Sequence, residues 1–253
     1  MSSLLRAAAW DVTHGFTTRA GGVSVGPYLG LNLGLSSGDD GATVERNRDL
    51  LLGDLGYSRA QVVAFHQVHG DRVLSGDPGW FVDEADAAVT DRADVLLVVS
   101  TADCVPLLFH DPRKGVVGAA HCGWRGTAAG LAGKVVTAMA ERHQSRPSDV
   151  RVALGPCMRG SCYQVGPEVI DAFVAAGVPD ACWRPDPVTA GRFYLDLPAA
   201  NLWSLERAGV RPANVSDLGL CTHCDAQAFY SHRRDRGVTG RHWAYVSLRR
   251  AEG

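Results

Sequence analysis

The chain has 253 residues, of which 46% are hydrophobic and 21% are charged, and this ordinary globular balance argues against a disordered protein. Its 25 basic and 27 acidic residues give a formal net charge of −2, without the basic excess that is typical of nucleic-acid-binding proteins. No run approaches the roughly 20 apolar residues of a membrane span, and residues 1–10 are too short an apolar segment for a secretory signal, so we expect a cytoplasmic protein with neither a membrane nor a nucleic-acid partner.

The first half of the chain predicts turns, one helix and three strands. Its first sixty residues are rich in glycine, which favours turns around short strands. Residues 43–55 predict a helix, with Val44, Leu51 and Leu55 apolar and residues 45, 46, 48 and 49 polar. The continuous Val and Leu run at residues 95–99 predicts a strand that is buried on both faces. Residues 105–109 and 115–120 predict two further strands.

The second half mixes helices and strands without strict alternation. Pro167 and Pro198 stand where a first helical residue would, and Gly209 would end the second of these helices. This mixture predicts an α/β or α+β fold class, with helices outside a sheet core. The predicted elements are helices over residues 127–143, 168–176 and 198–207, and strands over residues 150–154 and 243–248.

Three short segments place imidazole or thiol groups at the ends of predicted strands, where functional sites are commonly assembled. Two imidazoles and one thiolate could form a three-ligand zinc site with its fourth position open. Residues three apart on a strand face opposite sides, so spacing alone leaves the choice between His66 and His69 open. A single His or Cys is more often an ordinary core or surface residue. The candidate ligands are His66 or His69, Cys104 and His121.

Three other features each have a functional and a structural interpretation. The backbone of residues 123–126 could bind an anion ahead of a helix, or form a tight turn with Trp124 in the core. Arg48 could hold phosphate, although a lone arginine on a helix is more often solvated. Arg233 and Arg234 could pair with phosphate or with surface carboxylates.

The Cys-X-X-Cys motif at residues 221–224 could hold a second zinc ion. Cytidine-deaminase-like enzymes combine such a motif with an upstream His-X-Glu, which this chain lacks. A structural zinc would need further ligands, for which Cys157 and Cys162 are only distant candidates. We therefore expect these cysteines to be buried thiols.

Eight motifs, in the same order along the chain, closely resemble the YfiH-like laccase-domain family. The resemblance spans residues 15 to 246 and implies a single domain over residues 1–253 with an α/β/β/α layered fold. Members are labelled multicopper polyphenol oxidases or laccases, and better-characterised members act as purine nucleoside phosphorylases with adenosine deaminase and methylthioadenosine phosphorylase activity. The motifs are residues 15–24, 31–34, 67–70, 101–104, 121–126, 155–157, 221–224 and 229–235.

The resemblance also implies a site. It assigns zinc to His69 of Gln-Val-His-Gly, Cys104 of Thr-Ala-Asp-Cys and His121 before Gly-Trp-Arg-Gly, and so favours His69 over His66. It further implies that Asn32 and Arg48 line the pocket, which gives Cys104, Asn32 and Arg48 as the catalytic candidates. Two departures stand out. Cys122 replaces a common Ala beside one ligand, and residues 158–162 differ from the usual loop.

The residue chemistry argues against a true multicopper oxidase. Such enzymes need a Cys-His-Met centre and many imidazoles, whereas this chain has nine His, no His-X-His pair and three Met. Copper could still occupy the Cys/His₂ site, because it outranks zinc in affinity. We therefore expect a monomeric, zinc-dependent purine nucleoside phosphorylase that acts on a purine nucleoside (adenosine, inosine, guanosine or methylthioadenosine) and phosphate, with adenosine deaminase as a second activity. The alternatives are a copper-dependent polyphenol oxidase (laccase) and a hydrolase that edits peptidoglycan precursors.

Overall fold

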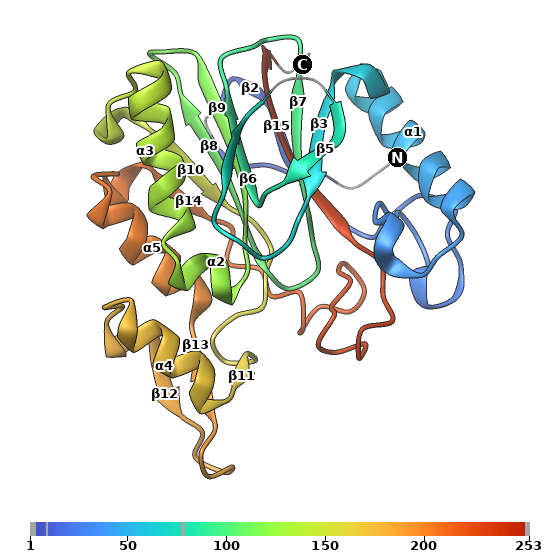
Figure 1. Cartoon of the computed structure of the whole chain (residues 1–253). Helices are drawn as coiled ribbons and strands as arrows, with labels where there is room; N and C mark the ends of the chain where they lie inside the picture. Colours follow the sequence, from blue (N-terminus) through green and yellow to red (C-terminus); the bar gives the residue numbers. More distant parts are fainter. Residues whose placement is uncertain (1–3, 9, 77–78, 251–253) are drawn as a thin grey trace.

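Two six-stranded sheets lie face to face in the computed structural model, which describes residues 4–8, 10–76 and 79–250 (Figure 1). In spatial order the first sheet contains β1 (Leu4–Leu5), β2 (Val12–Thr17), β15 (His242–Arg250), β7 (Leu96–Thr101), β3 (Val62–His66) and β5 (Gly79–Glu84). The second contains β14 (Val215–Asp217), β10 (Arg151–Leu154), β8 (Val105–Asp111), β9 (Val116–Cys122), β6 (Ala87–Thr90) and β4 (Val73–Ser75).

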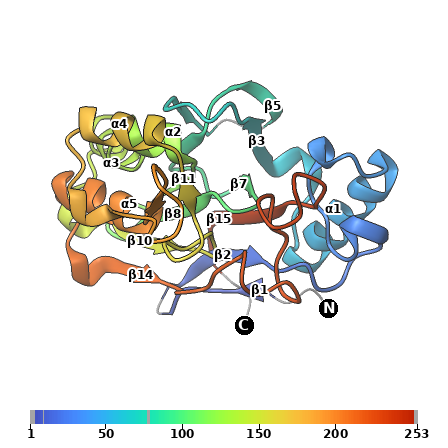
Figure 2. The same cartoon turned by 90° about the horizontal axis from the view of Figure 1, so that it is seen from below.

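Helices cover the outer faces of both sheets, and a small third sheet extends the lower part of the molecule in Figure 1. Seen from below, α1 lies on one side of the paired sheets and α3 and α5 lie on the other (Figure 2). The helices are α1 (Gly41–Leu55), α2 (Trp124–Ala128), α3 (Leu131–His143), α4 (Pro167–Ala175) and α5 (Leu197–Arg207). The third sheet contains β11 (Gln164–Val165), β13 (Phe193–Leu195) and β12 (Trp183–Pro185). Short 3₁₀ helices span Gly26–Tyr28, Leu35–Ser37, Arg59–Gln61, Pro147–Asp149, Asp180–Cys182 and Pro212–Asn214.

The alternation of side chains along the strands produces the layers. On β7, Leu96 and Val98 pack against the α1 layer, whereas Leu97 and Val99 pack between the two sheets. Both faces of this strand are therefore buried, as its continuous apolar sequence predicts. The predicted α/β class and the α/β/β/α layering are confirmed.

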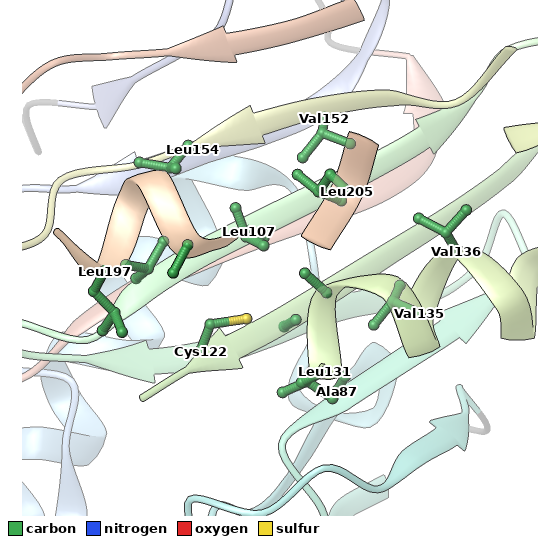
Figure 3. Packing of buried hydrophobic residues seen from close by; sticks show 14 of the residues in the cluster. Ala87, Leu107, Cys122, Leu131, Val135, Val136, Val152, Leu154, Leu197 and Leu205 are labelled. Atoms are coloured by element: carbon green, nitrogen blue, oxygen red, sulfur yellow. The ribbon is translucent and has the colours of Figure 1, made fainter. Parts of the chain in front are cut away.

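The second sheet repeats this alternation on β9. Val117 and Ala119 face the first sheet, whereas Val116, Ala120 and Cys122 belong to the core beneath the helices. Figure 3 shows the labelled Cys122 side chain within this helix-side core. Odd-numbered positions of β9 therefore point between the sheets, which decides the direction of His121.

One predicted helix is wrong in its extent. The segment predicted as a single helix over residues 127–143 forms α2 and α3, which are separated at Gly130. Gly130 has a φ of 77°, in the left-handed region that glycine adopts at little cost, so the chain turns there. Helix α2 also begins at Trp124, within the segment for which a turn was one interpretation.

Three connections carry the chain from the first sheet to the second, and two of them contain candidate ligands. One links β3 to β4 and contains His69, and the other links β7 to β8 and contains Cys104. Because β9 lies in the second sheet and ends just after His121, its end can meet both connections at one edge of the paired sheets.

Among the described residues, none of the helices is both long enough and apolar enough to cross a lipid bilayer. The expected domain over residues 1–253 includes termini that lie outside the described residues, and its extent stays a prediction.

Candidate metal centre and adjoining cavity

The donor atoms of His69, Cys104 and His121 all lie within 4.8 Å of one another. The two imidazole rings are nearly perpendicular, with centroids 4.8 Å apart. The structure thus brings together the three residues that the family resemblance implied. His66 is not part of this group and lies at the exposed end of β3, although it lines the adjoining cavity.

Cys122 points away from this cluster. It follows His121 on β9, so its side chain faces the opposite side of the sheet and is fully buried in the helix-side core. Burial raises the pKa of the Cys122 thiol, which keeps it protonated. This departure from the family pattern therefore places no second thiol among the candidate ligands.

A buried carboxylate orients two of the three candidate ligands. Asp86 accepts the backbone N–H groups of Val68, His69 and Gly70 at 3.2, 3.1 and 2.6 Å, and the Nδ1–H of His121 at 2.7 Å. The first three bonds hold the turn in which His69 adopts a φ of 60°. The fourth leaves Nε2 of His121 as its available donor atom, as a carboxylate commonly does for a metal-binding imidazole.

Asp86 is not among the site residues predicted from the sequence, although its apolar surroundings along the chain indicate a buried polar group. It is the one charged residue in the run Ala85-Asp86-Ala87-Ala88-Val89 and is completely buried. A buried carboxylate needs several hydrogen-bond donors, so an acidic residue inside an apolar run indicates a polar site.

The pKa values of Cys104 and His121 are shifted in opposite directions, because each group stabilises the charged form of the other. Burial would raise the pKa of the Cys104 thiol, but the imidazoles of His121 and His69 outweigh burial and lower it. Burial would lower the pKa of His121, but Cys104 and Asp86 outweigh it and raise the pKa. A thiolate is the form of cysteine that binds metals, so this donor set fits a zinc ion with one open position.

The turn that carries Cys104 is tied to a distant loop by its neighbour Asp103. Asp103 has a φ of 93°, and its carboxylate accepts Thr222 Oγ1 at 2.6 Å and the backbone N–H of Arg233 at 2.7 Å. Asp103 therefore fixes the position of Cys104 relative to the loop that contains Arg233.

A cavity of about 470 Å³ adjoins the three candidate ligands. Four guanidinium groups line it, whereas Asp103 is its one acidic lining residue and is already hydrogen-bonded. Such an excess of cations favours an anionic ligand. The four arginines are Arg48, Arg125, Arg233 and Arg241.

Two aromatic rings support guanidinium groups on the cavity wall. Arg125 lies 4.3 Å over the ring of Trp124, and Arg233 lies 5.2 Å over the ring of Tyr163. Trp124 is half-buried and also packs against the helix-side core, so it serves both the cavity and the fold.

Arg48 is buried, and its guanidinium group is held by hydrogen bonds and an ion pair. Its Nε donates to the carbonyl of Leu33 at 2.9 Å, and its Nη1 pairs with Glu45 at 3.0 Å. Burial lowers the pKa of Arg48. Arg48 lines the cavity, so the solvated-face interpretation of this residue is wrong.

Asn32 lies behind the cavity wall rather than in it. Its Oδ1 accepts the backbone N–H groups of Gly34 at 3.1 Å and Arg241 at 2.8 Å, and its Nδ2 donates to Ser37 and Asp39. Its side chain therefore holds the backbone that carries Arg241. The geometry gives Asn32 a positioning role, and its catalytic assignment stays a prediction.

Gly123 lies so close to the candidate ligands that a methyl group there should disturb them. A Cβ at this position would lie 2.8 Å from His69 Cδ2 and 3.3 Å from Cys104 Sγ. We expect Gly123→Ala to weaken zinc binding about tenfold or more, because displaced ligands lose coordination geometry. Zinc titration of the chelator-treated protein measures this. Gly53→Ala is the control, since nothing lies within 4 Å of its Cβ, and it should leave zinc binding unchanged.

The cysteines of residues 221–224 differ from the expected buried thiols. Cys224 is exposed, and its Sγ lies 3.3 Å from Sγ of Cys162, which the sequence suggested only as a distant candidate. His223 joins these two thiols in a second group of three potential metal ligands. The expectation of buried thiols is therefore wrong, because the two loops meet at the surface.

The nearby Arg234 has a structural role. It pairs with Asp235 at 2.8 Å and donates to the carbonyl groups of Thr222 and Phe229, each at 2.8 Å. Arg234 therefore braces the loop, and its neighbour Arg233 reaches the cavity.

Comparisons with known proteins cover nearly the whole chain. The sequence model of a family described as "Multi-copper polyphenol oxidoreductase laccase" matches residues 13–249. A protein of Deinococcus radiodurans named purine nucleoside phosphorylase is 45% identical over 252 residues, which cover 99% of this chain and 94% of that relative. The purine nucleoside phosphorylase YlmD of Bacillus subtilis is 36% identical over 251 residues, covering 95% and 90% of the two chains.

Solved structures are similar in fold. The crystal structure of YlmD from Geobacillus stearothermophilus aligns with a TM-score of 0.89 at 39% identity, over 94% of this chain and 92% of that one. The hypothetical protein YfiH of Bacillus licheniformis aligns with a TM-score of 0.90 at 35% identity, over 94% and 93%.

Proposed function

Because this chain belongs to the family described as multi-copper polyphenol oxidoreductase laccase, several of whose relatives are named purine nucleoside phosphorylases, we propose that it is a zinc-dependent purine nucleoside phosphorylase. The proposed ligands are His69, Cys104 and His121, and the proposed substrates are a purine nucleoside and phosphate. Deamination of adenosine is proposed as a second activity of the same site.

One observation carries this proposal. A single cavity of about 470 Å³ combines a Cys/His₂ cluster with four guanidinium groups. Its volume lies in the range of about 300–1,000 Å³ that is usual for small-molecule sites. Guanidinium groups bind phosphate oxygens through a fixed fork of donors, which supports phosphate as the second substrate.

The reaction makes separate demands on the two parts of the cavity. A phosphate oxygen attacks C1′ of the ribose, the bond from C1′ to N9 of the purine breaks, and the leaving base takes up a proton. Arg125, Arg233 and Arg241 would hold the phosphate against C1′. Trp124 and Tyr163 offer aromatic surfaces for the base. Bound zinc supplies a Lewis acid that polarises a substrate atom or activates water.

His66 is the proposed source of the proton. It lines the cavity at the exposed end of β3, whereas the carboxylate of the other candidate, Asp103, is engaged by Thr222 and Arg233. For adenosine deamination, water would add at C6 and ammonia would leave, and the same proton donor would serve the leaving amine.

The alternatives draw less support from the described residues. A multicopper oxidase needs several clustered imidazoles, and the two potential ligand groups in the described part of the chain contain two imidazoles and one imidazole respectively. A hydrolase for peptidoglycan precursors would need room for a large nucleotide-linked peptide, and a cavity of about 470 Å³ favours a nucleoside-sized substrate.

A metal-restoration assay tests the proposal. The protein is stripped of metal, reloaded with zinc, and incubated with inosine or adenosine, with and without phosphate. We expect free base and ribose-1-phosphate only when zinc and phosphate are both present. Release of base without phosphate, or oxidation of phenols with stoichiometric oxygen uptake after copper loading, would contradict the phosphorylase assignment.

Arg125→Ala should selectively weaken the use of phosphate. Arg125 is exposed beside the cavity, so its removal should leave the fold intact. Loss of a charged hydrogen bond of about 1.5–3 kcal/mol should raise the KM for phosphate roughly 10- to 100-fold, with a smaller effect on the KM for inosine. Arg113→Ala is the control, because Arg113 pairs with Asp149 away from the cavity. An equal increase of both KM values would exclude a specific phosphate role.

A further inference from the structure

Three cysteines and a histidine gather outside the catalytic cluster, and the proposed reaction uses none of them. Sγ of Cys162 and Sγ of Cys224 are 3.3 Å apart, and a nitrogen of His223 lies within 4.8 Å of both. Cys221 adjoins them, because its thiol hydrogen-bonds with that of Cys224. Cys122, Cys157 and Cys182 are buried in the core, so this group is not a general property of the cysteines.

The backbone arranges these side chains before any ion is added. Cys157 and Cys221 form a parallel bridge, in which Thr222 N–H donates to the carbonyl of Cys157 at 3.1 Å. The bridge sets the 157–162 loop beside the 221–224 turn. Arg159 reinforces this contact by pairing with Asp217, just ahead of the turn. Residues that are 62 positions apart in sequence are therefore held at contact distance.

The Cys221 sulfur receives hydrogen bonds from two segments of the backbone. It accepts backbone N–H groups from His223 and Cys224, within its own turn, and from Arg159 of the neighbouring loop. Hydrogen bonds of this kind orient ligating sulfurs and adjust their charge. The turn thus places Cys221 beside Cys224, which belongs to the group of three potential ligands.

We propose that Cys162, Cys221, His223 and Cys224 form a second, structural zinc site. A tetrahedral ion with Zn–S bonds of about 2.3 Å requires sulfur atoms about 3.8 Å apart, so the 3.3 Å between Cys162 and Cys224 needs only a small adjustment. Cys221 has to move closer, because it lies outside the group whose donor atoms are within 4.8 Å of one another. Four protein donors leave no position for a substrate, which is the arrangement typical of structural zinc. Three thiolates also favour zinc over the hard cations magnesium and calcium.

The proposed ion would brace one wall of the cavity. Tyr163 follows Cys162 directly and lines the cavity, and Arg233 stacks over its ring at 5.2 Å. Arg233 also donates to the carbonyl of Gln164 at 2.7 Å. Zinc binding would therefore join the two loops that carry these side chains. This inference does not depend on which reaction the cavity catalyses.

Zinc content of the full chain, measured by mass spectrometry under reducing conditions, tests the proposal. We expect two zinc ions per chain in the wild type. One should remain in Cys104→Ser and one in Cys162→Ser/Cys224→Ser, and none when the three substitutions are combined. Cys182→Ala, which removes a buried thiol outside both groups, should retain two. A single equivalent in the wild type that is lost in Cys104→Ser would overturn the second site, as would a Cys162–Cys224 disulfide in place of the ion.

Cobalt substitution and hydrogen exchange separate ligation from simple loss of structure. The cobalt-loaded Cys104→Ser variant serves as the background, in which only the second site retains thiolates. Its thiolate charge-transfer absorption should decrease when Cys221→Ser is added, and should disappear when Cys162→Ser/Cys224→Ser is added. Adding zinc to chelator-treated Cys104→Ser should slow amide exchange in residues 219–235, and should not do so after the double substitution. The four-donor site would be overturned if the absorption did not change with Cys221→Ser, or if amide exchange were the same with and without zinc.

Discussion

Cys104→Ser is expected to remove one equivalent of zinc and to lower phosphorolysis by roughly a thousandfold or more. Cys104 is the one thiol among the three clustered donors, and its pKa is lowered, which favours the thiolate form. A serine hydroxyl is far less acidic and ligates zinc poorly. Metal analysis and the phosphate-dependent assay measure the two effects.

Cys122→Ala is the matched control for this substitution. Cys122 is adjacent to His121 in sequence, but its side chain faces the helix-side core. The variant should keep its zinc and its turnover, and lose about 1 kcal/mol of unfolding free energy through the small cavity left behind. Full zinc occupancy in Cys104→Ser, together with lost turnover, would instead make Cys104 a nucleophile rather than a ligand.

Asp86→Asn should damage both the metal centre and the stability of the fold. The carboxylate accepts three backbone N–H groups and the Nδ1–H of His121. The asparagine side chain has only one accepting oxygen, and its NH₂ group would face N–H groups that need an acceptor. We expect zinc affinity to decrease about 10- to 100-fold. Unpaired buried groups should also reduce the unfolding free energy by roughly 3–5 kcal/mol. Zinc titration and denaturant unfolding measure these changes.

The pH dependence of stability supplies an internal check on the role of Asp86. Burial would raise its pKa, but the His121 imidazole and the N–H groups of Gly70 and Val68 outweigh burial and lower it. Its contribution to stability is therefore present above the unfolded carboxyl pKa of about 4 and is lost as the pH falls through the lower folded value. The difference between metal-free wild type and Asp86→Asn should narrow below about pH 4. Asp83→Asn, which alters an exposed pair with Arg72, should behave as wild type.

The layered fold was predictable where hydrophobic periodicity was strong. The all-apolar run on β7 required burial on both faces, and proline at the start of α4 and within the first turn of α5 marked where those helices begin. Gly130 was present in the sequence, yet the apolar pattern continued through it, so the break between α2 and α3 was missed. The resemblance to the YfiH-like family is confirmed by the family match and by the solved relatives.

The sites were less accessible to sequence reasoning because their members come from distant segments. The spacing of His69, Cys104 and His121 carried little information by itself, and the family motifs selected His69 over His66. The contact between Cys162 and Cys224 depends on how the loops of residues 157–162 and 219–235 pack. Local sequence contains no signal for that packing.

Two of the connections that cross between the sheets contain candidate ligands, which gives metal binding a consequence beyond catalysis. His69 and Cys104 lie where the polypeptide leaves one sheet for the other, and His121 belongs to the second sheet. An ion held by all three would link the two sheets at the edge where β9 ends. Above its dissociation constant, each tenfold rise in free zinc would then add about 1.4 kcal/mol to the unfolding free energy. The lifetime of the folded enzyme would follow the availability of the metal in its surroundings.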